Sequence, residues 1–143
     1  MGSKPKAVQP VRVLILCTGN SARSQMAEGW LRTLGGARFE VASAGTYPAA
    51  TVNPLATRVM AEVGIDISAQ FPKSIDQFLS QTWDYVIAVC DHANESCPFF
   101  PGGKRRLHWS FEDPAASTGD EGTRLAVFRR VRDAIRERID ILL

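Results

Sequence analysis

Cys17 and the loop after it combine the residue types that could do chemistry. The run Cys17-Thr-Gly-Asn-Ser-Ala-Arg23-Ser24 lies directly after the apolar stretch 11–16 and directly before a helical pattern. Small residues let successive backbone N–H groups converge on one point, and the next helix adds its positive end there. Arg23 presents a planar fork of donors that suits a tetrahedral oxyanion. The residues expected to bind such an anion are Thr18, Gly19, Asn20, Ser21, Ala22 and Arg23.

The same donors stabilise a negatively charged sulfur, which predicts that Cys17 is a nucleophile at neutral pH. Ser24 follows the arginine, and we expect its hydroxyl to hydrogen-bond the thiolate. A cysteine at a strand end is often only a small buried apolar residue. A strand before it, a helix after it and a polar loop between favour the catalytic interpretation.

Two further cysteines, Cys90 and Cys97, bound a polar segment after a predicted strand. Their separation is too long for a Cys-x-x-Cys redox motif, so they can join only if the segment folds back or changes shape. Metal binding with His92 and His108 is an alternative, although the spacing matches no common zinc pattern. Two structural cysteines are another. We favour a redox relay with Cys17, because an odd number of cysteines without a secretion signal indicates thiol chemistry.

A candidate general acid follows the last predicted strand. Asp113 precedes a proline, which holds it out of the helical region, and aromatic residues precede it. A carboxyl group in such surroundings is suited to proton donation. Glu112 is the rival carboxylate.

Alternating strand and helix patterns predict an α/β fold, a single-domain four-stranded parallel sheet flanked by helices. The sequence pattern predicts strands at residues 11–16, 39–43 and 85–89, and a fourth short strand near 106–108 after the Pro101-Gly102-Gly103 turn. Helical spacing predicts helices over 26–34, 54–63 and from Asp120 or Thr123 to Leu142, with a short one near 75–79. Ligands bind beyond the carboxyl ends of the strands in such sheets, so we expect Cys17 and Cys90 to meet in one crevice.

The chain has 143 residues and a net charge of +2, which indicates one domain and no nucleic-acid surface. We expect a disordered N-terminal extension over 1–10 and the domain over 11–143. No run is apolar enough to cross a membrane, and residues 1–10 do not look like a signal peptide. We expect a cytoplasmic protein without nucleic-acid or membrane partners.

Taken together, these motifs resemble the thioredoxin-coupled arsenate reductases built on the low-molecular-weight tyrosine phosphatase fold. The similarity runs from about Val11 to the last helix. The segments that show it are Cys17 to Trp30, Ser43-Ala-Gly45, Cys90 to Cys97-Pro98, His108-Trp109 and Asp113-Pro114-Ala115.

The resemblance implies arsenic detoxification. Arsenate would bind in the loop, Cys17 would attack arsenic, and Asp113 would protonate the leaving oxygen. Cys90 would then attack Cys17 and expel arsenite, and Cys97 would move the disulfide to an exposed pair that thioredoxin reduces. We expect a monomer that needs no cofactor. Ala22 stands where some relatives carry an additional cysteine.

Some relatives also bind potassium beside the loop. Asn20, Glu28 and Ser43 fit that pattern, but Phe71 and Lys73 stand near where polar and acidic ligands belong. We expect no metal, with the lysine charge replacing that of the ion.

A low-molecular-weight protein tyrosine phosphatase is the alternative function, with the same Cys17, Arg23 and Asp113. It hands its intermediate to water and needs neither Cys90 nor Cys97, so these two thiols favour the reductase, with weak phosphatase activity persisting. A non-enzymatic oxyanion sensor has no use for the relay. Related enzymes use glutathione and glutaredoxin or mycothiol, and the two extra thiols favour thioredoxin.

Overall fold

The structure is a computed structural model that describes residues 9–91 and 100–143. Most of the predicted N-terminal extension therefore lies outside the described residues. The same is true of His92 and Cys97.

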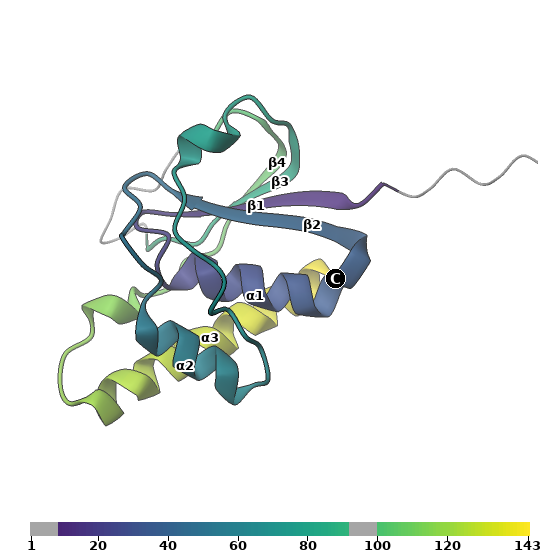
Figure 1. The fold of residues 1–143 in the computed structure, drawn as a ribbon. Helices are drawn as coiled ribbons and strands as arrows, with labels where there is room; N and C mark the ends of the chain where they lie inside the picture. The colour runs from purple at the N-terminus through teal and green to yellow at the C-terminus, as the bar shows by residue number, and fades with distance from the viewer. Residues whose placement is uncertain (1–8, 92–99) are drawn as a thin grey trace, which may run out of the picture.

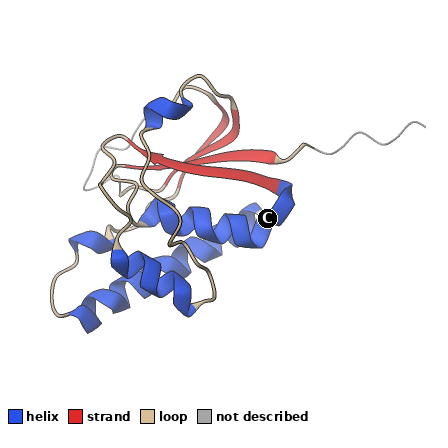
Figure 2. Cartoon of the chain, viewed as in Figure 1, coloured by secondary structure: helices blue, strands red, loops and turns tan. Residues whose placement is uncertain are grey.

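Four parallel strands form one sheet, which confirms the predicted fold class (Figures 1 and 2). They are β1 (Val11–Cys17), β2 (Phe39–Gly45), β3 (Trp83–Ala88) and β4 (Gly103–His108), in the spatial order β2-β1-β3-β4. The central strand β1 pairs with β2 from Val11↔Phe39 to Cys17↔Gly45. β4 begins three residues before the predicted strand at 106–108. The prediction was too short because β4 lies at the edge of the sheet, where the exposed side chains of Lys104 and Arg105 give no apolar pattern.

The long helices are α1 (Arg23–Gly35), α2 (Pro54–Glu62) and α3 (Glu121–Leu142). Short 3-10 helices are η1 (Gly36–Arg38), η2 (Ile75–Phe78) and η3 (Pro114–Ala116). α1 begins three residues before the predicted start at Met26, because its first turn is polar although it is buried. α3 is capped by Asp120, whose side chain accepts from the Thr123 N–H at 2.8 Å, which decides between its two predicted beginnings.

Helices flank the sheet unevenly. All three α-helices pack on one face, whereas η2 lies on the other (Figure 1). Side chains alternate along β1, so Val13 and Ile15 point towards the α-helices and Leu14 and Leu16 towards the opposite cluster with Phe100. Within the described part of the chain, no helix combines the length and hydropathy that a bilayer crossing requires.

A charged cluster joins α2 to α3. The Glu62 carboxylate accepts from Arg129 Nη2 at 2.8 Å and from Arg132 Nη1 at 2.9 Å. Arg132 is buried and also donates to the Val59 carbonyl. The hydrogen bonds from Arg129 and then Arg132 lower the pKa of Glu62 from 4.5 to about 2. The pair therefore links the two helices most strongly while Glu62 is charged.

Glu62→Gln is expected to lower the free energy of unfolding at pH 7 by about 1 kcal/mol, since the side chain is 37% exposed and solvent screens the pair. A carboxylate with a lowered pKa stabilises the fold above its unfolded pKa and loses that effect as the pH falls towards the folded one. The difference between variant and parent should therefore narrow from about pH 5 to about pH 3 in urea unfolding. Glu137→Gln, an exposed acid on α3, is the control, and a difference that does not depend on pH would contradict this account.

Candidate active site

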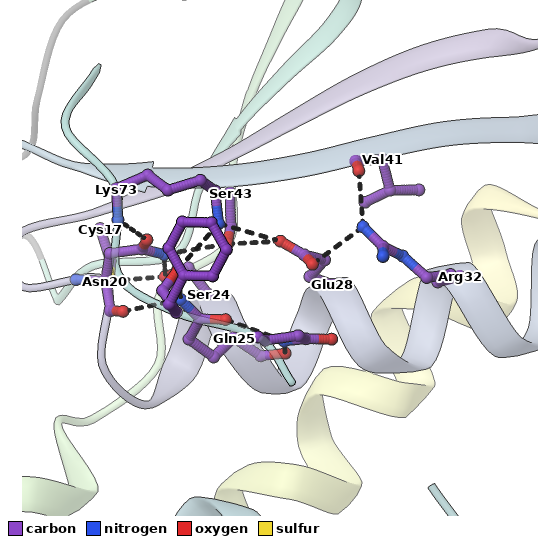
Figure 3. Close-up of polar contacts among 11 residues, drawn as sticks. Cys17, Asn20, Ser24, Gln25, Glu28, Arg32, Val41, Ser43 and Lys73 are labelled. Atoms are coloured by element: carbon purple, nitrogen blue, oxygen red, sulfur yellow. Dashed lines mark hydrogen bonds and ion pairs between the residues drawn. The ribbon is translucent and has the colours of Figure 1, made fainter. Parts of the chain in front are cut away.

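Cys17 is the last residue of β1, and its thiol is not disulfide-bonded. The residue is 2% exposed. Its Sγ lies 2.9 Å from Ser24 Oγ and accepts from the Asn20 N–H at 3.2 Å (Figure 3). The structure thus places two polar groups against the predicted nucleophile. The backbone N–H comes from the predicted loop, and the hydroxyl comes from the first turn of α1.

Asn20 has a φ of 50°, which lies in the left-handed region that asparagine tolerates better than most residues. Its buried side chain donates to Ser24 Oγ at 2.7 Å and to Ser43 Oγ at 2.9 Å. Its Oδ1 accepts from the Lys73 N–H at 2.9 Å. One side chain therefore ties the loop to α1, to β2 and to the segment after α2.

The segment 47–53 runs alongside the loop. Its backbone N–H groups donate at 2.8 to 2.9 Å to three loop carbonyls, those of Thr18, Gly19 and Ser21. In a trans peptide the C=O of one residue and the N–H of the next point in opposite directions. The N–H groups that follow these carbonyls therefore point away from segment 47–53, and the one on Asn20 reaches Cys17 Sγ. The loop is built to present N–H donors to one side.

Arg23 begins α1 and is 4% exposed. Its Nη1 donates to the Phe111 carbonyl at 3.2 Å, and its Nη2 lies 3.9 Å from Asp113 Oδ2. Asp113 is the N-cap of η3 and accepts from the Ala115 N–H through Oδ1 at 3.0 Å. The structure therefore brings this carboxylate, which follows β4 far along the chain, close to Arg23.

Glu112, the rival carboxylate, is engaged elsewhere. Its Oε1 accepts from Arg130 Nη2 at 2.6 Å, and both side chains are at least half exposed. Of the two carboxylates, Asp113 is the one that the structure places 3.9 Å from Arg23 Nη2.

Cys90 lies two residues beyond the end of β3, is fully buried and, unlike Cys17, is disulfide-bonded in this structure. Val89 donates its N–H to the Leu16 carbonyl at 2.9 Å, so the chain stays beside β1 until Cys90. The Cys90 carbonyl lies 2.8 Å from His108 Nε2 at the end of β4. Cys17 and Cys90 therefore lie at the same edge of the sheet, after adjacent strands. Cys97 lies outside the described residues.

Glu28 of α1 is the centre of a second buried cluster, next to the loop. Its Oε1 accepts from Ser43 Oγ at 2.7 Å and lies 3.8 Å from Lys73 Nζ. Arg32 donates to its Oε2 at 2.9 Å, and Lys73 Nζ also donates to the Phe71 carbonyl. A lysine ammonium thus already faces the carboxylate that a potassium ion would need, so these residues do not fit a bound ion.

Some contributors to the site left little trace in the sequence. Segment 47–53 and Phe111 act through backbone groups, which any residue can supply. Gln25 donates from Nε2 to the Asn20 carbonyl at 2.9 Å and to the Phe71 carbonyl at 3.1 Å. The sequence shows Gln25 only as a polar residue next to Ser24, and the structure shows that this position of α1 is buried.

The model of the low molecular weight phosphotyrosine protein phosphatase family matches residues 12–143. The chain belongs to this family.

Several proteins that are similar to this chain are arsenate reductases. The arsenate reductase of Halalkalibacterium halodurans is 51% identical over 127 residues, which cover 89% of this chain and 91% of that protein. A solved arsenate reductase in its phosphate-binding state matches with a TM-score of 0.79 at 37% identity, over 92% of this chain and 95% of the other. A thioredoxin-dependent arsenate reductase from Corynebacterium glutamicum matches with a TM-score of 0.66 at 32% identity, over 96% of this chain and 66% of the other.

Gly45→Ala tests how closely β2 supports the loop. A Cβ on Gly45 would lie 2.6 Å from the Thr18 carbonyl oxygen and 3.0 Å from the Asn20 nitrogen, both backbone atoms that cannot rotate away. We expect a loss of roughly 1–3 kcal/mol in the free energy of unfolding measured with urea. Gly19→Ala, whose Cβ would meet nothing within 4 Å, is the matched control and should stay within about 0.5 kcal/mol of the parent. Equal losses in both variants would contradict the close approach.

Proposed function

We propose that this protein reduces arsenate to arsenite through a relay of three thiols, with thioredoxin as the final reductant. The observation that supports this best is the placement of two buried cysteines at the carboxyl ends of adjacent strands, Cys17 at the end of β1 and Cys90 just beyond β3. The relay starts from the protein in which the disulfide of Cys90 has been reduced. The similar arsenate reductases, one of them thioredoxin-dependent, support the same proposal.

In the first step arsenate binds to the loop N–H groups and the Arg23 guanidinium. The Cys17 thiolate attacks arsenic, an As–O bond breaks, and Asp113 donates the proton with which the oxygen leaves as water. The 3.9 Å separation of Arg23 Nη2 and Asp113 Oδ2 supports this role, because the acid lies near the arginine that would hold the anion. Ser24 and the Asn20 N–H stabilise the thiolate before the attack.

In the second step the Cys90 thiolate attacks the sulfur of Cys17. The S–As bond breaks and its electron pair goes to arsenic, which leaves as arsenite, while Cys17 and Cys90 become a disulfide. Cys97 then attacks Cys90, releases the Cys17 thiolate and forms a Cys90–Cys97 disulfide. A thioredoxin dithiol reduces that disulfide and becomes oxidised. Each step is a thiolate displacement in which the electrons balance.

Weak hydrolysis of aryl phosphates is the second activity we propose. Cys17, Arg23 and Asp113 meet the needs of that reaction, in which water replaces Cys90 as the second nucleophile. The monomeric state and the cytoplasmic location expected from the sequence stay predictions.

Asp113→Asn should keep anion binding and slow the chemical step by about a hundredfold or more, because the leaving oxygen loses its proton donor. Glu112→Gln is the matched control and should keep nearly full activity, since Glu112 pairs with Arg130 on the surface. Single-turnover arsenate reduction, with phosphate affinity measured in parallel, checks both. The opposite ranking would identify Glu112 as the acid.

Cys97→Ser should reduce one equivalent of arsenate and then stop with Cys17 joined to Cys90, whereas Cys90→Ser should not complete that turnover. The reason is that Cys90 expels arsenite, while Cys97 only frees Cys17 and exports the oxidising equivalents. The measurement is NADPH oxidation with thioredoxin and its reductase, run against a glutathione and glutaredoxin system, with mass mapping of disulfides after an arsenate pulse.

Both variants should keep aryl phosphate hydrolysis, and Cys17→Ser should lose both activities. Sustained thioredoxin-linked turnover in Cys97→Ser would show that the third thiol is dispensable. Turnover with glutathione alone would assign a different reductant.

A further inference from the structure

A continuous chain of hydrogen bonds joins the Glu28 carboxylate to the Cys17 thiol (Figure 3). Ser43 Oγ donates to Glu28 Oε1 at 2.7 Å and accepts from Asn20 Nδ2 at 2.9 Å. The other proton of that amide goes to Ser24 Oγ at 2.7 Å, and Ser24 Oγ lies 2.9 Å from Cys17 Sγ. Because a carboxylate only accepts, it sets the direction of the first bond. Because a thiolate also only accepts, the Ser24 hydroxyl donates to it.

Glu28 is the acceptor at the end of this chain of hydrogen bonds, so the groups that hold its carboxylate also fix the first bond. The residue is only 3% exposed, and burial penalises a lone carboxylate strongly. Two cations offset that penalty, Arg32 at Oε2 and Lys73 at Oε1. Arg32 is mostly exposed, whereas the Lys73 side chain is 14% exposed. Lys73 is therefore the less screened of the two, and it faces the same oxygen as Ser43.

Lys73 is held in place on three sides. Its N–H donates to Asn20 Oδ1, its carbonyl accepts from the Gly45 N–H at 2.8 Å, and its Nζ donates to the Phe71 carbonyl at 2.9 Å. Its ammonium lies 4.9 Å from the centre of the Phe71 ring. Burial lowers the pKa of Lys73 and the charge of Glu28 acts against this. Such a residue is preorganised for one partner, unlike an exposed lysine that samples many positions.

We infer that Lys73 is a positioning residue for the nucleophile: a built-in cation that fixes Glu28 and, through Ser43, Asn20 and Ser24, orients the donor to the Cys17 thiolate. It follows that the loop needs no dissociable alkali cation to be competent. The inference rests on the proposed function only in requiring Cys17 to be the attacking thiol.

The test uses the reactivity of Cys17 itself, which needs no arsenate. In a Cys90→Ser, Cys97→Ser background, the second-order rate constant for alkylation by iodoacetamide at pH 7 should fall about tenfold in Lys73→Ala, comparable to losing one charge-assisted contact. Lys104→Ala, an exposed lysine paired with Asp84 at the sheet edge, is the matched control and should not change. Lys73→Arg keeps the charge and should stay within about threefold of the parent.

Chemical rescue separates charge from packing. A surface cavity of about 320 Å³ lined by Glu28, Arg32 and Lys73, among others, gives a small amine access to the vacated position. Propylammonium should restore most of the rate in Lys73→Ala and propanol should not. The parent rate should be the same in potassium, sodium and choline chloride.

Three results would overturn the inference: an unchanged rate in Lys73→Ala, equal rescue by propanol, or no rescue by propylammonium in a variant whose urea unfolding resembles that of Lys104→Ala. A parent protein that alkylates in this way but does not reduce arsenate would count against the proposed function and leave the role of Lys73 standing.

Discussion

The left-handed conformation of Asn20 is the constraint on which the site depends. A φ of 50° costs of order 1 kcal/mol for a residue other than glycine, so surrounding contacts must hold it. They do so through a buried side chain that donates to two hydroxyls and accepts from the Lys73 N–H. The same turn of the backbone directs the Asn20 N–H at the Cys17 sulfur. The conformation of Asn20 therefore sets both the shape of the loop and the surroundings of the Cys17 thiol.

The central position of β1 explains why these groups meet. β2, on one side, ends in Ser43-Ala-Gly45. Ser43 supplies a hydroxyl to the hydrogen bonds between Glu28 and Asn20, and Gly45 lets the loop after Cys17 lie close to β2. β3 on the other side leads to the buried Cys90. Because all three strands are parallel, their carboxyl ends lie at one edge, and residues far apart in sequence are brought together without a long loop.

Features with a local pattern were predictable from the sequence. The apolar run into Cys17, the polar loop and the periodic helices gave the correct fold, because periodicity reports burial directly. The extent of β4 was not predictable, since an edge strand with exposed Lys104 and Arg105 lacks alternation. The choice of Asp113 over Glu112 depends on Arg23 and on Arg130, both distant in sequence, so no local pattern could make it.

In the proposed mechanism, the competition between hydrolysis and reduction depends on which nucleophile reaches the intermediate on Cys17. Water is abundant but unoriented, whereas the reduced thiol of a cysteine just beyond the neighbouring strand would act at a high effective concentration. Cys90 is buried, and Val89 donates to the Leu16 carbonyl of β1. Once the disulfide of Cys90 is reduced, the first approach of its thiol would therefore demand little ordering of the chain. In the proposed relay, the later transfer to Cys97 must leave the disulfide where a protein reductant can reach it. In the proposed reaction, arsenic therefore reacts at the buried Cys17, and only the disulfide is transferred to a pair of cysteines that the reductant can reach.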